Sequence, residues 1–406
     1  MTAVAATSAV KASPRRSRWW VVHQWAGLQA SLLLAFILAT GTLATVATEI
    51  DWLIHPAMRV VPRDGPPASW GDIATSARVA AGNARVERIS APVASRFAVE
   101  VIASGGKEDQ RFRIQIDPWT AKVQGITSWT NTQRILRELH RHLMLPLDWG
   151  LPVVAILSLP MILSAVTAFW VYKKWWRGFF RLPQSRPTRR GDARRFIGDL
   201  HRFAGLWTWW FVLLIGLTGL WYLVEWGGGE APPMSRPATM PAPTQLEGAA
   251  LDQLVAKALQ TYPGLRISSI YFPDGKQGGV IIMGQAEALL VRDRANSVQL
   301  DAASRQPVQR LRGVDLSVHQ RISEAADPLH FGNWGGLASK LLWFACGCVL
   351  TGLAVSGLVI YALRLHGRAG NAVRLRSIWR GMGLLAWPSA IVIAIALGAI
   401  LSRLVL

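Results

Sequence analysis

Two histidines open the same six-residue pattern in distant parts of the chain. The pattern reads His-Gln-Trp-Ala-Gly-Leu at 23–28 and His-Arg-Phe-Ala-Gly-Leu at 201–206. In each copy a glycine follows the histidine by four residues, so on a helix the imidazole shares its face with a position that has no side chain. Such a face suits a flat macrocycle. His23 and His201 are therefore candidate ligands of a haem iron, which imidazoles commonly bind.

Two further histidines form a looser repeat. Leu139-His140 and Leu329-His330 each precede another apolar run. Membrane electron carriers typically hold haem between two axial histidines from neighbouring helices. We expect His140 and His330 to be a second pair of haem-iron ligands. His142 points another way from His140 on a regular helix, and whether it replaces or assists His140 stays open.

Five apolar runs could position these histidines in a membrane. They cover about 20–46, 151–172, 203–224, 337–362 and 382–402. Each approaches or exceeds the ~20 residues that a helix needs to cross a hydrocarbon core of roughly 30 Å. The sequence predicts a membrane all-α bundle of five transmembrane helices, and the recurring histidine patterns indicate an internal duplication.

The formal net charge of +20 is concentrated in short segments. Every Asp and Glu except Asp192 and Asp199 falls within about 47–150 or 223–336, where acidic and basic residues roughly balance. By the positive-inside rule the basic segments are cytoplasmic, which places the N-terminus inside and, after five spans, the C-terminus outside. Lipid headgroups explain this charge placement, and nucleic acid is not expected as a partner.

Each long outer segment has the pattern of a small α+β module. A helical run is followed by strand-like runs and a turn signal that begins with or contains an aspartate. The first segment has its helix at 72–82, strands at 84–90, 96–104 and 110–116, and its turn at 117–120. The second has its helix at 249–260, strands at 265–272, 278–284 and 288–293, and its turn at 300–303.

The direction of each span decides which histidines can pair. His23 and His201 begin outward-running spans at the inner face, whereas His140 and His330 begin inward-running spans at the outer face. The expected pairs are therefore His23 with His201 and His140 with His330, with one haem in each leaflet. The alternative is that these are interfacial residues with their polar tips among headgroups. Their recurrence at matched helix ends favours ligation, because ionisable groups facing a membrane bundle are usually functional.

The chain from about 18 to 366 resembles the PepSY-associated transmembrane proteins. The resemblance rests on the two histidine patterns above and on Thr40-Gly41, Glu49-Ile50-Asp51, Leu139-His140-Arg141-His142-Leu143, Thr218-Gly219 and Asp327-Pro328-Leu329-His330-Phe331-Gly332. It implies a multi-pass protein of the bacterial inner membrane with two periplasmic PepSY-like modules. It also implies a link to iron or siderophore uptake, since some members of the family are similar to haem-containing reductases of ferric siderophores.

These arguments give a complete set of expected domains. They are a basic cytoplasmic tail (1–18), transmembrane helix 1 (19–46), PepSY-like module 1 (47–138), transmembrane helix 2 (139–172), a basic cytoplasmic loop (173–200), transmembrane helix 3 (201–224), PepSY-like module 2 (225–328), transmembrane helix 4 (329–362), a cytoplasmic loop (363–380) and transmembrane helix 5 (381–406).

The expected activity follows from the resemblance. Two haem b groups would pass electrons outward to a ferric siderophore or another ferric chelate and so release iron in the periplasm. The sequence has no dinucleotide-binding motif, so the electron donor would be a quinol or a separate reductase. The alternative is a non-redox membrane protein whose modules bind or regulate a periplasmic protein or peptidase.

Overall fold

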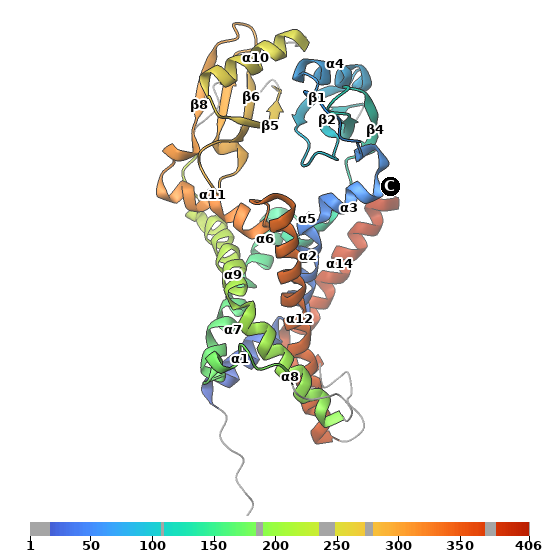
Figure 1. The fold of residues 1–406 in the computed structure, drawn as a ribbon. Coiled ribbons are helices and arrows are strands. Elements are labelled where there is room, and N and C mark those ends of the chain that lie inside the picture. The colour runs from blue at the N-terminus through green and yellow to red at the C-terminus, as the bar shows by residue number, and fades with distance from the viewer. Residues whose placement is uncertain are drawn as a thin grey trace, which may run out of the picture.

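The protein consists of a helical bundle with a β-sheet unit at one end (Figure 1). The computed structural model describes residues 17–106, 109–183, 190–234, 248–272, 279–369 and 379–405. Helices α5 (Thr132–His142) and α11 (Val318–Phe331) lie beneath the sheet unit, whereas α1 (Arg18–Gln29) and α8 (Arg190–Trp207) lie at the far end of the bundle. The histidine-bearing helices therefore lie at opposite ends of the bundle.

Four helical stretches among the described residues are long and apolar enough to cross a bilayer. They are Leu147–Val171 (α6, Leu147–Ala155, and α7, Ser158–Val171), Trp209–Gly229 (α9, Trp209–Val224, and η3, Glu225–Gly229), Gly336–Arg364 (within α12, Gly336–Ala369) and Gly383–Arg403 (η6, Gly383–Leu385, and α14, Ala386–Val405). A fifth crossing is available if α1 and α2 (Ser31–Thr45), which are bent by 65° at Ala30, form one span. The structure therefore supports a multi-pass membrane protein with four to five spans.

Both segments that begin with the repeated histidine pattern are interrupted after it, although each was expected as one helix. The first breaks at Ala30 and the second at Thr208, each seven residues after its histidine. Neither position is proline or glycine, and nothing in the local sequence explains the break. The spacing is the same in the two halves of the chain.

We call His140 and His330 the outer histidines, because their helices lie at the sheet end of the bundle, and His23 and His201 at the far end the inner ones. The outer histidines do not begin spans, which corrects the helix boundaries expected at 139 and 329. His140 belongs to α5, which ends before a turn in which Leu143 and Met144 both have positive φ and Pro146 precedes α6. His330 belongs to α11, which ends at Gly332 in the left-handed conformation (φ 69°). Left-handed residues thus separate each of these helices from the span that follows, and in the first half Pro146 lies at the N-cap of α6.

The sheet unit contains two modules with the same order of elements. The first has α4 (Trp70–Ala81), β1 (Arg85–Ser90), β2 (Val99–Gly105), β3 (Gln110–Ile116) and β4 (Val123–Ser128). The second has α10 (Gly248–Thr261), β5 (Arg266–Tyr271), β6 (Val280–Gln285), β7 (Ser297–Leu300) and β8 (Pro307–Leu311). The strand expected over 288–293 is wrong, because that stretch is a loop that leads into η4 (Asp293–Ala295).

The two modules share one antiparallel sheet in the order β4-β3-β2-β1-β5-β6-β7-β8. Pairing of β1 with β5 joins them, with Ile89 opposite Ile270. Helices α4 and α10 pack together at a glycine pair: a Cβ added to Gly71 would lie 2.3 Å from the carbonyl oxygen of Gly248. A side chain at either position would separate the helices that cover the shared core.

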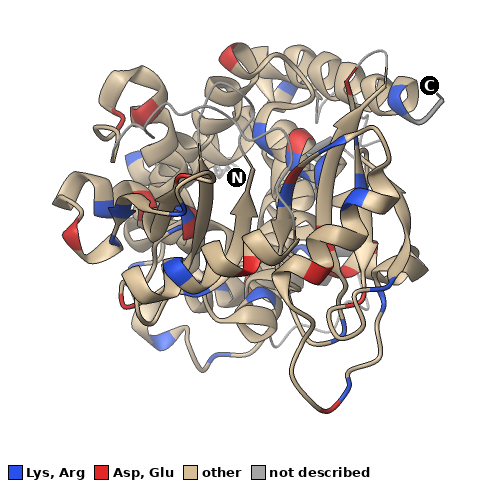
Figure 2. Ribbon diagram, turned by 90° about the horizontal axis from the view of Figure 1, so that it is seen from above, with Lys and Arg blue, Asp and Glu red and all other residues tan. Residues whose placement is uncertain are grey.

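Three connecting segments tie the sheet unit to the bundle. Helix α3 (Ala47–Ile54) follows α2 and is joined to α12 by an ion pair of 2.7 Å between Glu49 and Lys340. The other two are the 3-10 helices η1 (Pro56–Met58), which follows α3, and η5 (Gly313–Asp315), which lies between β8 and α11. The 3-10 helix η2 (Trp175–Arg177) lies between α7 and α8, at the other end of the bundle. Seen from the sheet end, acidic and basic residues are interspersed over the modules (Figure 2).

Candidate functional site

The outer histidines of the two halves lie next to each other. The ring centres of His140 and His330 are 6.0 Å apart, and their planes are inclined by 39°. A metal-bound imidazole nitrogen lies about 2 Å from the ion and its ring centre about 1 Å further, so two imidazoles on one ion have centres about 6 Å apart. The spacing of this pair would therefore allow both imidazoles to hold one iron ion.

Hydrogen bonds determine which nitrogen of each outer histidine is available. Nδ1 of His140 lies 2.9 Å from the carbonyl oxygen of Ile37, which can only accept. Nδ1 of His330 lies 2.8 Å from Oγ1 of Thr218, whose own proton is donated to the carbonyl of Leu214. Nδ1 of His140 must therefore carry the proton, and Nδ1 of His330 carries it when the Thr218 hydroxyl donates to a backbone carbonyl. The Nε2 lone pair, which ligates metals in neutral imidazole, is left free.

A glycine on α2 allows His140 to reach this position. A Cβ added to Gly41 would lie 2.5 Å from Cε1 and 2.7 Å from Nδ1 of His140. The imidazole thus lies directly against the backbone of α2, one turn from the carbonyl that orients it. Gly41 belongs to the Thr-Gly dipeptide that recurs at Thr218-Gly219, where the threonine orients His330.

The inner histidines are oriented in the same way at the other end of the bundle. Nδ1 of His23, on α1, lies 3.0 Å from the carbonyl oxygen of Ser164 on α7. Nδ1 of His201, on α8, lies 2.8 Å from Oγ of Ser356, which donates its own proton to the carbonyl of Leu353. Nε2 of His23 is therefore left unprotonated in the neutral ring, and Nε2 of His201 likewise when the Ser356 hydroxyl donates to Leu353. The two side chains are close enough to interact electrostatically.

Open space lies beside the inner histidines. A Cβ added to Gly27 would meet no atom within 4 Å, and one added to Gly205 would meet only Cδ2 of Leu353, at 3.8 Å. These are the glycines that follow His23 and His201 by four residues. The helix faces beside the inner imidazoles therefore have room for a flat group.

The donor set as a whole fits haem better than a metal held by protein alone. Among the described residues, no group of three or more His, Cys, Asp or Glu is placed to hold an ion. Paired imidazoles suffice when a porphyrin supplies the other four nitrogens, and a hydrogen-bonded Nδ1 is the usual support of a ligating histidine. The residues present therefore fit the cofactor expected from the sequence.

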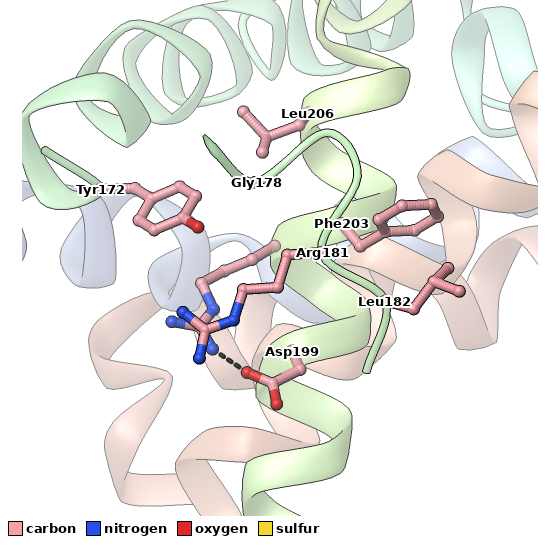
Figure 3. A pocket seen from close by; sticks show the side chains of 8 residues that line it. Tyr172, Gly178, Arg181, Leu182, Asp199, Phe203 and Leu206 are labelled. Atoms are coloured by element: carbon pink, nitrogen blue, oxygen red, sulfur yellow. Dashed lines mark hydrogen bonds and ion pairs between the residues drawn. The ribbon is translucent and has the colours of Figure 1, made fainter. Parts of the chain in front are cut away.

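The inner end of the bundle also has two adjoining pockets beside α8. One is lined by Tyr172, Gly178, Arg181, Leu182, Asp199, Arg202, Phe203 and Leu206, and an ion pair joins Arg202 to Asp199 (Figure 3). The other, of about 430 Å³, is lined by Phe169, Trp175, Phe179, Leu206 and Trp209. A polar pocket and an aromatic one thus share Leu206, five residues after His201.

The other described histidines have separate contacts. Nδ1 of His142 lies 2.6 Å from the carbonyl of Leu145 and so closes the turn after α5. Nε2 of His319 lies 3.1 Å from the carbonyl of Gly229, and His55 lies 3.9 Å from Asp51. These contacts give His142 a role in the turn, and among the histidines with described side chains a ring contact joins His140 and His330.

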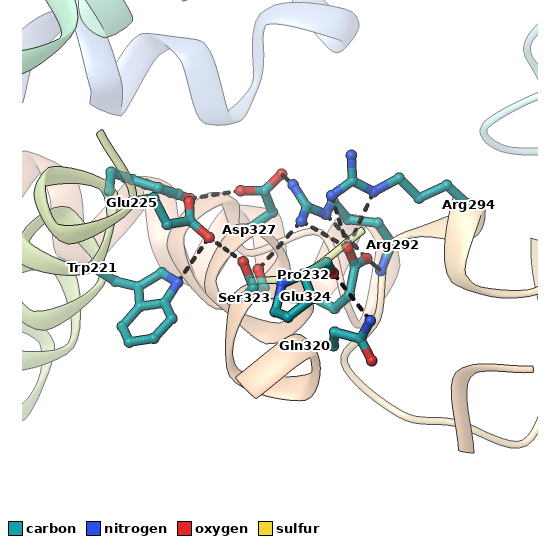
Figure 4. Close-up of polar contacts among 10 residues, drawn as sticks. Trp221, Glu225, Pro232, Arg292, Arg294, Gln320, Ser323, Glu324 and Asp327 are labelled. Atoms are coloured by element: carbon teal, nitrogen blue, oxygen red, sulfur yellow. Dashed lines mark hydrogen bonds and ion pairs between the residues drawn. The ribbon is translucent and has the colours of Figure 1, made fainter. Parts of the chain in front are cut away.

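A polar network links the outer pair to the second module, and the sequence did not reveal it (Figure 4). The Tyr222 ring lies 5.3 Å from that of His330, and its hydroxyl donates to Asp327 over 2.8 Å. Asp327 also accepts from Arg292, at 3.0 Å, and Arg292 binds the buried Glu324 at 2.7 Å. Burial opposes charge on Glu324, but hydrogen bonds and positive charge from Arg292 and Arg294 outweigh it and lower the pKa of the carboxyl.

The corresponding anchor in the first half is Asp51, which is 1% exposed. Its carboxylate accepts from the backbone N–H groups of Thr132, at 2.8 Å, and Gln133, at 2.9 Å, at the N-terminus of α5. The side chain of Asn131 caps the same helix by accepting from the N–H of Arg134 over 3.0 Å. Asn131 is the sequence signal that could have revealed α5 as a separate helix.

Comparison with known proteins agrees with this architecture. Residues 20–364 match the family described as the PepSY-associated TM region. The comparison with curated proteins gives no significant match. Because the family match covers most of the sequence, the chain belongs to the PepSY-associated transmembrane family.

Proposed function

We propose that this protein carries electrons across the bacterial inner membrane and reduces a ferric siderophore on the periplasmic side. The observation that carries the proposal is the arrangement of the four histidines. They come from both halves of the chain, lie at opposite ends of the bundle two by two, and each has a hydrogen-bond partner at Nδ1. Interfacial histidines with their tips among headgroups would not need buried partners of this kind.

His23 and His201 would hold an inner haem b, and His140 and His330 an outer one. Bound haem iron supplies one-electron oxidation and reduction at each end of the bundle. The chain's own part is to orient the imidazoles, through Ser164 and Ser356 at the inner end and through Ile37 and Thr218 at the outer end. Two sites divide a crossing of roughly 30 Å into shorter steps.

Reduction of the chelated iron would release it to uptake. Oxygen ligands attract a triply charged ion more strongly than a doubly charged one, so reduction weakens a ferric chelate. The modules lie next to the outer pair through α5 and α11 (Figure 1), which makes them the walls that a periplasmic chelate would meet.

The electron donor would act at the inner end. A quinol reaches this region from the lipid, and the aromatic cavity next to α8 offers flat rings to a quinol head group. A separate reductase could instead dock on the basic loop that contains Lys173 and Lys174. Both donors deliver electrons to the end of the bundle that contains His23 and His201.

Purified protein in liposomes tests the proposal. With a quinol as reductant and ferric siderophore outside, we expect a ferrous-specific chelator to report iron release. His140→Ala or His330→Ala should abolish the release, and the control His319→Ala, at an exposed histidine, should not. Absence of iron reduction in haem-replete protein, or reduction that is indifferent to all four histidines, would favour the alternative that the modules bind a periplasmic protein or peptidase.

A further inference from the structure

Two arginines lie on the helix that contains His140 and form no hydrogen bond or ion pair with another described residue. Arg137 and Arg141 lie one turn apart on α5, and both are exposed. Within the described ranges, neither guanidinium makes a hydrogen bond, an ion pair or a ring contact. Other cations at this end of the bundle do form ion pairs: Arg134 pairs with Glu138 at 2.9 Å, and Lys340 pairs with Glu49 at 2.7 Å.

The position of these arginines connects them to both histidines of the outer pair. Arg141 follows His140 directly, and Arg137 precedes it by three residues and so lies on an adjacent face of the helix. Arg141 also lies within electrostatic reach of Arg137, Asp327 and Tyr222. Tyr222 lies on α9, with its ring 5.3 Å from the His330 ring, and Asp327 lies on α11. The guanidinium of Arg141 is therefore on the side of α5 that faces α9 and α11.

Asp327, the carboxylate within electrostatic reach of Arg141, is already paired. Asp327 receives a hydrogen bond from Tyr222 on one oxygen and an ion pair from Arg292 on the other (Figure 4). Glu324 is likewise occupied by Arg292 and Arg294. Two guanidinium groups one turn apart, with five N–H donors each, match the planar, bidentate geometry of carboxylates.

We propose that Arg137 and Arg141 bind the carboxylates of a ligand held beside the outer histidine pair. This inference rests on the proposed function, which supplies two sources of carboxylate: the propionates of the outer haem, or an anionic ferric chelate. The chemistry of recognition is the same for both. An arginine pair at this place would favour anionic over cationic chelates if the chelate is the source.

The test compares wild type, the double variant Arg137→Gln/Arg141→Gln, and the control Arg63→Gln at an exposed loop arginine. Gallium(III) citrate serves as a redox-inert anionic probe in equilibrium binding by calorimetry, next to a cationic gallium hydroxamate chelate. If the chelate is the source, the double variant should bind gallium citrate at least about tenfold more weakly, with hydroxamate binding and haem content unchanged.

If the propionates are the source, the double variant should lose the outer haem or shift its midpoint potential, with citrate binding unchanged. Unchanged citrate binding, haem content and potential in the double variant would overturn the proposal and leave Arg137 and Arg141 as lipid-headgroup contacts. Wild-type protein without haem whose citrate binding still depends on the two arginines would refute the proposed function while upholding the carboxylate site.

Discussion

Replacing Gly41 by alanine should dislodge the outer histidine pair. The new Cβ would lie 2.5 Å from Cε1 of His140, which falls 0.9 Å short of ordinary contact at 3.4 Å. The ring must therefore move by close to 1 Å, and its 2.9 Å hydrogen bond to Ile37 cannot survive that movement. Overpacking of this kind costs about 1–3 kcal/mol, and the lost bond about 1 kcal/mol more.

Gly398→Ala provides the matched control. Both glycines lie within apolar helices, but a Cβ at Gly398 meets nothing within 4 Å. Alanine should stabilise a helix at such an open site by up to about 1 kcal/mol. A loss of stability in Gly41→Ala but not in Gly398→Ala is therefore steric in origin. Thermal unfolding in detergent and haem content measure the two effects. Gly41→Ala protein with wild-type stability and full haem content would refute the reasoning.

Three further predictions concern the rest of the fold. Glu324→Gln should lower the unfolding free energy by about 3 kcal/mol, the lower end for a buried pair because Arg292 keeps 28% exposure. Since the folded-state pKa of Glu324 is lowered, this stabilisation is complete above pH 4.5 and is lost as the pH falls through the folded value. The difference in Tm between this variant and wild type should therefore shrink in acid, and a constant difference would contradict the assignment. Gly248→Val should separate α4 from α10, because a Cβ at this position would lie 2.5 Å from Oγ1 of Thr75. The variant's modules should therefore be cleaved faster in limited proteolysis, and a cleavage rate equal to that of wild type would contradict the glycine contact. A reporter fused after Leu406 should be active outside the cytoplasm, since α14 ends at the sheet end of the bundle, and cytoplasmic activity would mean a miscounted span.

Much of the architecture follows from local sequence patterns. Long apolar runs indicate membrane helices by length alone, and the helices of both modules appear close to their expected bounds, at Trp70–Ala81 and Gly248–Thr261. The turn at Asp117 is confirmed, since its carboxylate accepts from the backbone N–H groups of Trp119 and Thr120. These features are encoded within a few residues, which is why one sequence reveals them.

Other features depend on contacts that no local pattern encodes. Pairing of β1 with β5, which fuses the modules into one sheet, joins strands far apart in the sequence. The Arg292–Glu324 pair spans 32 residues. On sequence alone the end of α5 is assigned to the span that follows it, because Leu139 and Leu143 extend the apolar pattern up to the turn formed by left-handed residues. Long-range pairing and backbone conformation of this kind are decided by the assembled fold.

The optical spectrum and haem content of the purified protein test the central claim most directly. We predict reducible b-type bands and two haems per chain. His140→Ala and His330→Ala should each remove the same one, and His23→Ala and His201→Ala the other. A colourless preparation from haem-replete cells, or variants in which His23 and His140 lose the same haem, would contradict the two paired sites.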